Sequence, residues 1–457
     1  MPSAAGTDQQ TTNQPNRSPG TRDRFPLEIW ILVACGFIIA VGFGILAPAL
    51  PTFAASFDVG VTAVSLTISA FAFMRLVFAP ASGKLVTRLG ERRVYFWGLV
   101  IVAVATAVCG FAAEYWQLLL FRSLAGIGST MFTVSGVAML IRLSPPAMRG
   151  RASGLWATSF LLGNITGPLI GGGLVEISIR LPFLVYGVTV LLAAFVSLIF
   201  LRNSTQADRE TEETPTAPMR IRDALRHKTY RAALASNFGN GWAVFGVRIS
   251  LIPLFVVEVL RTGESMAGFS LAVFAAGNAA ALLFSGRLAD RIGRKPLALA
   301  GLLVSGGGTI WLGFTGSVEM FLAASLIAGV GSGMLSPPQS AVVADIIGNR
   351  GKGGPVLAGF QMAADVGAII GPLVAGVLAD TVSYGAAFGV TGLITLLAVI
   401  FWVPAPETLP KPTAAATVEP AASGKATELA PESGALFDAP EPPTGERLGG
   451  KPGQPDA

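Results

Sequence analysis

The chain lacks most of the residues on which catalytic and metal chemistry depends. Its 457 residues include two cysteines and one histidine, and 13% are charged, whereas a soluble domain carries roughly a quarter. Cys35 and Cys109 lie in apolar runs, which favours small packing residues over a disulfide or a metal site, and His227 lies in a polar stretch. The sequence has no Walker loop and no metal-ligand spacing. We expect no metal and no cofactor, and an enzyme is disfavoured.

Apolar residues dominate instead. Hydrophobic residues make up 52% of the chain, and its mean hydropathy is +0.62. A membrane-spanning helix needs about 20 apolar residues, and by that measure the sequence predicts an all-α membrane protein with twelve spans. The predicted spans are Leu27–Leu50, Val61–Val86, Val94–Ala112, Gln117–Arg142, Ser153–Val175, Pro182–Leu201, Arg231–Val257, Met266–Gly286, Pro296–Thr315, Met320–Ile347, Gly354–Leu378 and Tyr384–Val403.

The loops between these spans alternate in charge. One set is basic and holds Lys84, Arg88, Arg92, Arg93, Arg142, Arg149, Arg151, Arg287, Arg291, Arg294, Lys295, Arg350 and Lys352. The other set is mostly acidic and holds Asp58, Glu114, Glu176, Glu258, Glu264, Glu319 and Asp380, with Arg180 and Arg261. Because basic loops stay in the cytoplasm, we expect a multi-pass protein of the cell membrane with both termini cytoplasmic. The net charge of +5 then needs no nucleic-acid partner.

Two halves of the chain repeat one pattern. The stretch from Gly83 to Gly90 matches that from Gly286 to Gly293, an offset of 203 residues. Such repeats are typical of transporters whose halves rock around a site near the middle of the membrane. We expect a disordered cytoplasmic N-terminus (1–26), an N-terminal six-helix half (27–201), a cytoplasmic linker (202–230), a C-terminal six-helix half (231–403) and a disordered cytoplasmic tail (404–457).

A glycine-rich segment with a proline also repeats, and it is the most specific signal in the chain. Its residues are Gly163, Gly167, Pro168, Gly171 and Gly172 in the fifth predicted helix, and Gly367, Gly371 and Pro372 in the eleventh. Glycines every fourth residue let a neighbouring helix approach closely in lipid, and a proline bends or loosens a helix. The pattern predicts two bendable, closely packed helices at equivalent places.

These residues resemble signatures of the major facilitator superfamily and, within it, the twelve-helix drug/proton antiporters. Gly163–Gly172 is similar to the antiporter motif of the family's fifth helix, and Leu118–Gly128 is similar to its fourth-helix motif. The resemblance covers roughly residues 27–403 and implies the major facilitator fold. It also implies that Arg122 couples proton movement to the substrate step. A structural bond from Arg122 to backbone carbonyls is the other interpretation.

The resemblance further implies a cytoplasmic gate motif after the second helix of each half. Its residues are Gly83, Thr87, Arg88 and Gly90 in the first half, and Gly286, Asp290, Arg291, Gly293 and Arg294 in the second. We expect Asp290 to pair with a neighbouring arginine and latch the gate, because an aspartate at a helix end forms charge-assisted pairs. Thr87 cannot do so, and we expect a weaker latch there. Alternatively, these residues only anchor the basic loops.

Away from the ends of the predicted spans, four charged residues are embedded in the membrane: Arg75, Arg122, Arg248 and Asp365. Such residues are costly in lipid and are functional candidates for that reason. In the resembled fold the second and eleventh helices face each other, so we expect Arg75 to pair with Asp365 until the carboxylate takes a proton. A permanent structural pair is the alternative. Arg248 can attract an anionic group of a substrate or repel cations.

The resemblance also indicates which helices line a substrate cavity. The polar and aromatic candidates on them are Phe37, Phe43, Phe71, Trp156, Asn164, Asn240, Trp242, Phe245, Asn278, Gln339 and Gln361. Aromatic walls with few charges suit an amphipathic or lipophilic small molecule.

The sequence therefore predicts a monomeric secondary transporter that exports small amphipathic or drug-like molecules, with protons as the exchanged ion. One alternative is an uncoupled or differently coupled exporter of sugars or metabolites. Alternatives of another class are a multi-pass membrane enzyme, which would need a catalytic cluster, and a channel, which the two-fold repeat disfavours.

Overall fold

The computed structural model describes residues 25–144, 148–201, 219–348 and 353–409. Within these ranges it has twelve helices that are long and apolar enough to cross a membrane, and no strand. The predicted all-α architecture with twelve spans is confirmed. Most of the segments expected as N-terminus (1–26), linker (202–230) and tail (404–457) lies outside the described residues.

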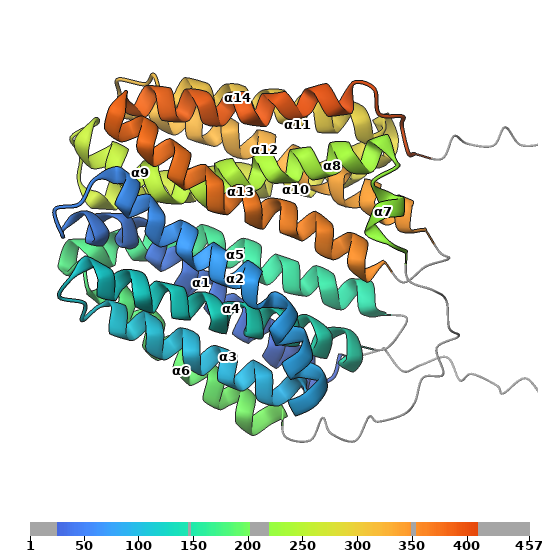
Figure 1. Ribbon diagram of the computed structural model, residues 1–457, viewed down its shortest axis with the longest axis horizontal. Helices are drawn as coiled ribbons and strands as arrows, with labels where there is room; N and C mark the ends of the chain where they lie inside the picture. Colours follow the sequence, from blue (N-terminus) through green and yellow to red (C-terminus); the bar gives the residue numbers. More distant parts are fainter. Residues whose placement is uncertain (1–24, 145–147, 202–218, 349–352, 410–457) are drawn as a thin grey trace, which may run out of the picture. The chain divides into compact units, whose positions relative to one another are not determined.

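The first half consists of six helices, which Figure 1 shows in blue to green. They are α1 (Leu27–Ala55), α2 (Val61–Leu89), α3 (Glu91–Cys109), α4 (Tyr115–Leu143), α5 (Arg149–Ile177) and α6 (Leu181–Phe200). Within this half α1 packs on α5 and α6, and α4 packs on α2 and α3. The bounds differ by a few residues from the predicted ones: α2, α4 and α5 extend beyond the predicted ends, whereas α3 ends three residues earlier.

The second half repeats this arrangement (Figure 1). After the short α7 (Ile221–Ala224) come α8 (Lys228–Asn240), the π-helix η3 (Gly241–Val247), α9 (Arg248–Glu258), α10 (Glu264–Ile292), α11 (Arg294–Leu312), α12 (Val318–Ile347), α13 (Gly354–Thr381) and α14 (Tyr384–Trp402). The two halves meet where α2 packs on α13 and where α5 packs on α10.

The seventh span is therefore not one α-helix, as the sequence predicted for Arg231–Val257, but is interrupted by η3. A π-helix accommodates extra residues per turn and often occurs at a functional site. Gly241 lies so close to the backbone of Ala364 on α13 that a side chain there would overlap it. The apolar content that identifies a span does not reveal such an interruption.

The glycine-proline segments pack closely on the first span of each half. Gly44 of α1 packs on α5, where a Cβ added to it would lie 2.7 Å from Pro168 Cδ. Gly246 of η3 packs on α13 in the same way, 2.7 Å from Pro372 Cδ. Both prolines lie inside continuous helices. The repeated motif thus sets the distance between the first and fifth spans of each half.

Residues 404–409, expected to begin a disordered tail, instead lie against α11. The carboxylate of Glu407 accepts hydrogen bonds from the backbone N–H groups of Arg294 at 3.1 Å and Lys295 at 3.0 Å. The first N–H groups of a helix have no partner within the helix, and Glu407 supplies one. The Lys295 ammonium in turn donates to the carbonyl of Val403 at 2.7 Å.

Candidate functional site

Three adjoining cavities lie at the centre of the protein, two of them between the halves and one, around Trp156, mostly within the first half. We name them by one lining residue each: the Trp156 lobe (about 260 Å³), the Asp365 lobe (about 170 Å³) and the Arg248 lobe (about 150 Å³). Phe43 of α1 and Phe245 of η3 line all three. Each phenylalanine directly precedes the glycine that packs on its half's proline, Gly44 or Gly246. The repeat therefore places one aromatic ring from each half at the centre.

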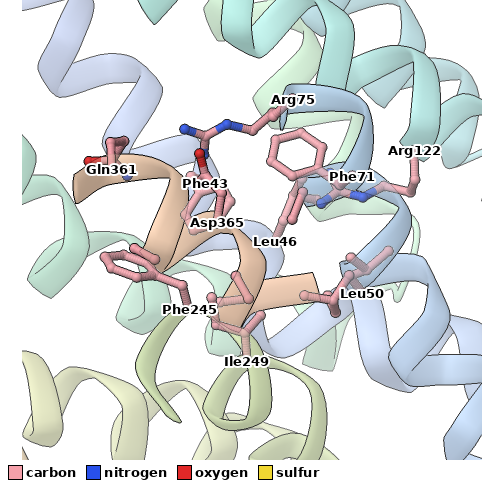
Figure 2. A pocket seen from close by; sticks show the side chains of 15 residues that line it. Phe43, Leu46, Leu50, Phe71, Arg75, Arg122, Phe245, Ile249, Gln361 and Asp365 are labelled. Atoms are coloured by element: carbon pink, nitrogen blue, oxygen red, sulfur yellow. The ribbon is translucent and has the colours of Figure 1, made fainter. Parts of the chain in front are cut away.

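The Asp365 lobe holds the only carboxylate that lines these cavities in the described part of the chain. Figure 2 shows the Arg75 guanidinium of α2 extending toward the Asp365 side chain of α13. Gln361, one turn before Asp365, faces the same carboxylate. Among described residues the two charged groups form no ion pair within 4.0 Å. The predicted partners thus share a cavity across the two halves without being locked together.

Two further arginines are buried against phenylalanine rings. Arg122 is 3% exposed, and its Cζ lies 4.4 Å from the centre of the Phe71 ring of α2. Arg248 is 5% exposed, and its Cζ lies 3.9 Å from the centre of the Phe274 ring of α10. A guanidinium over an aromatic face is stabilised by the ring's quadrupole. Neither forms an ion pair with any described carboxylate.

Seven of the predicted cavity residues line these lobes, and four do not. Those that line them are Phe43, Phe71, Trp156, Asn164, Phe245, Asn278 and Gln361. Trp242 is buried and donates from Nε1 to Thr391 Oγ1 of α14 at 3.3 Å, and Gln339 accepts from Ser236 Oγ of α8 at 3.0 Å. Asn240 accepts from Ser332 Oγ at 3.1 Å, and Phe37 is 37% exposed outside the three lobes. Whether a residue lines the cavities depends on how its helix is rotated about its axis, and the position of a span in the sequence does not reveal that rotation.

Within the described ranges, the ion pair expected for the gate motif is absent from this state, and a neighbouring pair is present. Asp290 and Arg291 are exposed, and Asp290 forms no ion pair with the residues that the structure describes. Arg294, the last arginine of the motif, pairs instead with Asp345 at the end of α12. The equivalent positions in the first half are Glu91 and Arg142, which pair at 3.0 Å with the charges exchanged.

The remaining motif residues shape the ends of helices. Thr87 donates to the carbonyl of Lys84 within α2 at 2.8 Å, and Arg88 is exposed. Gly90 (φ 82°) and Gly293 (φ 104°) adopt backbone angles that favour glycine. Each glycine is the single residue between two helices: Gly90 separates α2 from α3, and Gly293 separates α10 from α11.

The two halves are held together at the end of the helical bundle where the acidic loops lie. We call this the acidic end, and the other the basic end. The carboxylate of Asp380, at the end of α13, accepts from the backbone N–H groups of Val61 and Thr62 at 2.8 Å each and from Thr62 Oγ1 at 2.6 Å. It thereby caps the N-terminus of α2 in the other half. The sequence predicts only an acidic loop residue at Asp380.

The second contact at the acidic end consists of small residues. A Cβ added to Gly172 of α5 would lie 3.0 Å from the Ser265 carbonyl oxygen of α10, and one added to Gly268 would lie 2.9 Å from Gly172 Cα. The glycine segment of α5 therefore has two roles. Gly163, Gly167 and Gly171 pack on α1 in their own half, and Gly172 packs on the other half.

At the basic end the same four helices have open space beside them. A Cβ added at Gly83 of α2, Gly154 of α5, Gly286 of α10 or Gly354 of α13 meets no described atom within 4 Å. The hydrogen bonds of Asp380 and the contact of Gly172 with α10, which join the halves, thus lie at the acidic end.

Twelve spanning helices in two equivalent halves around a central cavity define a membrane transporter. A model of the Major Facilitator Superfamily matches residues 32–260 and again 233–440, so the chain belongs to this superfamily. The predicted family is confirmed.

Named relatives and one solved structure extend this result. Multidrug resistance protein 1 of Bacillus subtilis (strain 168) is 26% identical over 367 residues, which cover 78% of this chain and 90% of that protein. Tetracycline resistance protein, class H, of Pasteurella multocida is 25% identical over 383 residues, covering 82% and 93%. A bacterial homolog of the human lysosomal transporter Spinster, inward-facing and unoccupied, shares the fold with a TM-score of 0.68 at 17% identity, covering 84% of this chain and 96% of that one.

Proposed function

We propose that this transporter exports small amphipathic or drug-like molecules across the cell membrane in exchange for protons. The basic end then faces the cytoplasm, with both chain termini on that side, and the protein works as a monomer in the bilayer. The names of the relatives and the aromatic centre formed by Phe43 and Phe245 support the substrate class. The observation that carries the proton coupling is Asp365 facing Arg75 between the halves.

Alternating access follows from the two ends of the interface. In the proposed cycle the present state is the one closed at the acidic end, where Asp380 and Gly172 join the halves, and a molecule reaches Phe43 and Phe245 from the basic end. The opposite state requires the acidic-end contacts to separate and the basic ends of α2, α5, α10 and α13 to approach. The space beside their glycines allows that approach.

Asp365 links this motion to protons. Of the charged groups described, Arg75 on α2 is the one whose charge reaches the carboxylate, and α8, η3 and α14 add none. When Asp365 is ionised, its attraction to Arg75 draws α13 and α2 together near the basic end. When it takes a proton, that attraction disappears, which favours the present state. Asp365 then releases its proton to the cytoplasm in the same step in which the substrate binds from the cytoplasm.

Transport in inverted membrane vesicles tests this proposal. Vesicles are energised with a proton gradient and given a panel of lipophilic dyes and antibiotics, and uptake is compared for wild type, Asp365→Asn and Glu319→Gln. Glu319 is an exposed carboxylate at the acidic end and serves as the matched control. We expect gradient-driven uptake in wild type and the control, and its loss in Asp365→Asn. Wild-type transport that ignores the gradient would instead identify an uncoupled exporter.

A further inference from the structure

The Arg248 lobe contains a buried positive charge that nothing described in the protein neutralises. The side chain is 5% exposed, and its Nε and one terminal nitrogen have no hydrogen-bond partner. The Phe274 ring covers one face of the guanidinium, with the ring centre 3.9 Å from Cζ. Leaving such donors unpaired in a low-dielectric site is costly, so an anionic group that enters the lobe and pairs with them binds with a large gain in free energy.

The scaffold does not require this charge. Arg248 follows Phe245 by three positions, and Leu46 follows the equivalent Phe43 by three. Leu46 also faces the central cavity, in the Asp365 lobe. An apolar residue therefore fills the equivalent place in the first half, and Arg248 is a departure from the repeat that serves something other than folding.

The rest of the lobe suits a small polar head attached to an apolar body. Asn164 of α5 and Asn278 of α10 line it beside Arg248. The amide of Asn278 donates to Ser332 Oγ at 3.1 Å, which fixes its orientation. Phe43, Phe245 and Asn164 also line the larger Trp156 lobe, so a molecule with its head at Arg248 can place its body between the two rings.

We infer that the Arg248 lobe is an anion subsite and that the substrates include amphipathic organic anions, above all aromatic carboxylates. This rests on the proposed function and names a substrate class for the same cavity. The planar guanidinium matches a carboxylate, the two asparagines supply further polar contacts, and the aromatic body lies against Phe43 and Phe245. Asp365, across the cavity in a separate lobe, keeps its proton role.

Equilibrium binding without any gradient tests the inference. The purified full chain in phosphatidylcholine nanodiscs, where no anionic lipid competes, is titrated with 2-naphthoate and with its neutral analogue, 2-naphthamide. We expect wild type to bind the carboxylate at least about tenfold more tightly than the amide, since charge-assisted bonds in a buried site are strong. Arg248→Leu, which copies Leu46, is expected to lose this preference and still bind the amide.

Arg248→Lys provides a second variant that keeps the charge without the planar fork. We expect an intermediate preference, which a purely structural role of Arg248 would not produce. Equal binding of the two compounds by wild type, no binding of the carboxylate, or an unchanged preference in Arg248→Leu would each overturn the subsite. Because no gradient is applied, these results are independent of whether Asp365→Asn uncouples transport.

Discussion

The two contacts that join the halves at the acidic end are related by the internal repeat, yet their chemistry is opposite. Where α13 meets α2, Asp380 accepts three hydrogen bonds from Val61 and Thr62. Where α5 meets α10, the equivalent positions hold Glu176 and Glu264, and the charge of Glu176 acts on Glu264. One contact is a clasp, and the other brings two carboxylates together. The repeated backbone forms two similar surfaces, and the side chains at equivalent positions determine whether the two halves attract or repel each other there.

The difference indicates the order in which the acidic end opens. The contact between α5 and α10 rests on the fit of Gly172 to Gly268 and carries a repulsion, so little opposes its separation. The contact between α2 and α13 loses three hydrogen bonds to charged oxygens when it separates. We expect α5 and α10 to separate first and the Asp380 clasp to set the energy of the opening.

The largest effect is expected from filling the glycine contact. In Gly268→Ala the new methyl group would overlap the Pro168 carbonyl oxygen and lie 2.9 Å from Gly172 Cα, both in the other half. Overpacking of this kind costs about 1–3 kcal/mol, which here applies only to the closed acidic end. The open form should therefore gain about fivefold or more in population relative to the closed one.

Labelling of a cavity cysteine measures this population. Ala47 lines the Asp365 and Arg248 lobes and is 7% exposed, and Ala47→Cys reacts with an impermeant maleimide added on the acidic side only when that end opens. The two native cysteines, Cys35 and Cys109, are buried and are replaced by alanine. Gly173→Ala, beside which there is nothing within 4 Å, is the control. Equal labelling of Gly268→Ala and this control would contradict the prediction.

Removing the clasp should have the next largest effect. Asp380→Ala deletes the acceptor of all three bonds, and each bond to a charged oxygen contributes about 1.5–3 kcal/mol when buried. Asp380 is exposed, so water replaces much of this, and we expect a net change of about 1 kcal/mol and a several-fold rise in labelling at Ala47→Cys. Asp58→Asn removes a nearby exposed carboxylate that has no such bond. The prediction fails if both variants label alike.

The repelling contact should respond in the opposite direction. Glu264→Gln removes one of the two facing charges and lets α10 approach α5 more favourably at the acidic end. Surface charge pairs are worth about 0.2–1 kcal/mol, so labelling should fall by about threefold or less. The reduction should shrink in high salt, because exposed charges are screened. A rise in labelling would show that Glu264 stabilises closure by another route.

These contrasts mark the limit of what the sequence predicts. Span length and hydropathy predicted twelve helices, and the repeat predicted two halves, because both depend on local composition. The charges in the membrane were located for the same reason. The Asp380 clasp joins residues 318 positions apart in sequence, and the Arg294–Asp345 pair joins two helices that the sequence did not pair. Such contacts depend on how each helix is rotated about its axis, and no pattern along the chain fixes that rotation.

A smaller contrast between the halves lies at the start of α3 and α11, and it leads to a pH prediction. Helix α3 begins with Glu91, an acid that suits a helix N-terminus, whereas α11 begins with Arg294 and Lys295. Glu407 compensates by accepting from both of their backbone N–H groups. Burial raises the pKa of Glu407, but its hydrogen bonds from backbone N–H groups outweigh burial and hold the pKa below the ordinary value of 4.5.

The sign of the effect follows from this depressed pKa. The stabilisation by Glu407 is fully present above the ordinary glutamate pKa and is lost as the pH falls through the lower pKa of the folded protein. Glu407 is exposed, so we expect well under about 1 kcal/mol. Thermal unfolding in detergent at pH 7 should show Glu407→Gln slightly less stable than wild type, and the difference should shrink below pH 4.5 and vanish once the pH is below the lower pKa of the folded protein. Asp290→Asn changes an exposed carboxylate at the same end, and its difference in stability from wild type should not shrink with falling pH. If the difference between Glu407→Gln and wild type persists in acid, the effect comes from side-chain packing instead.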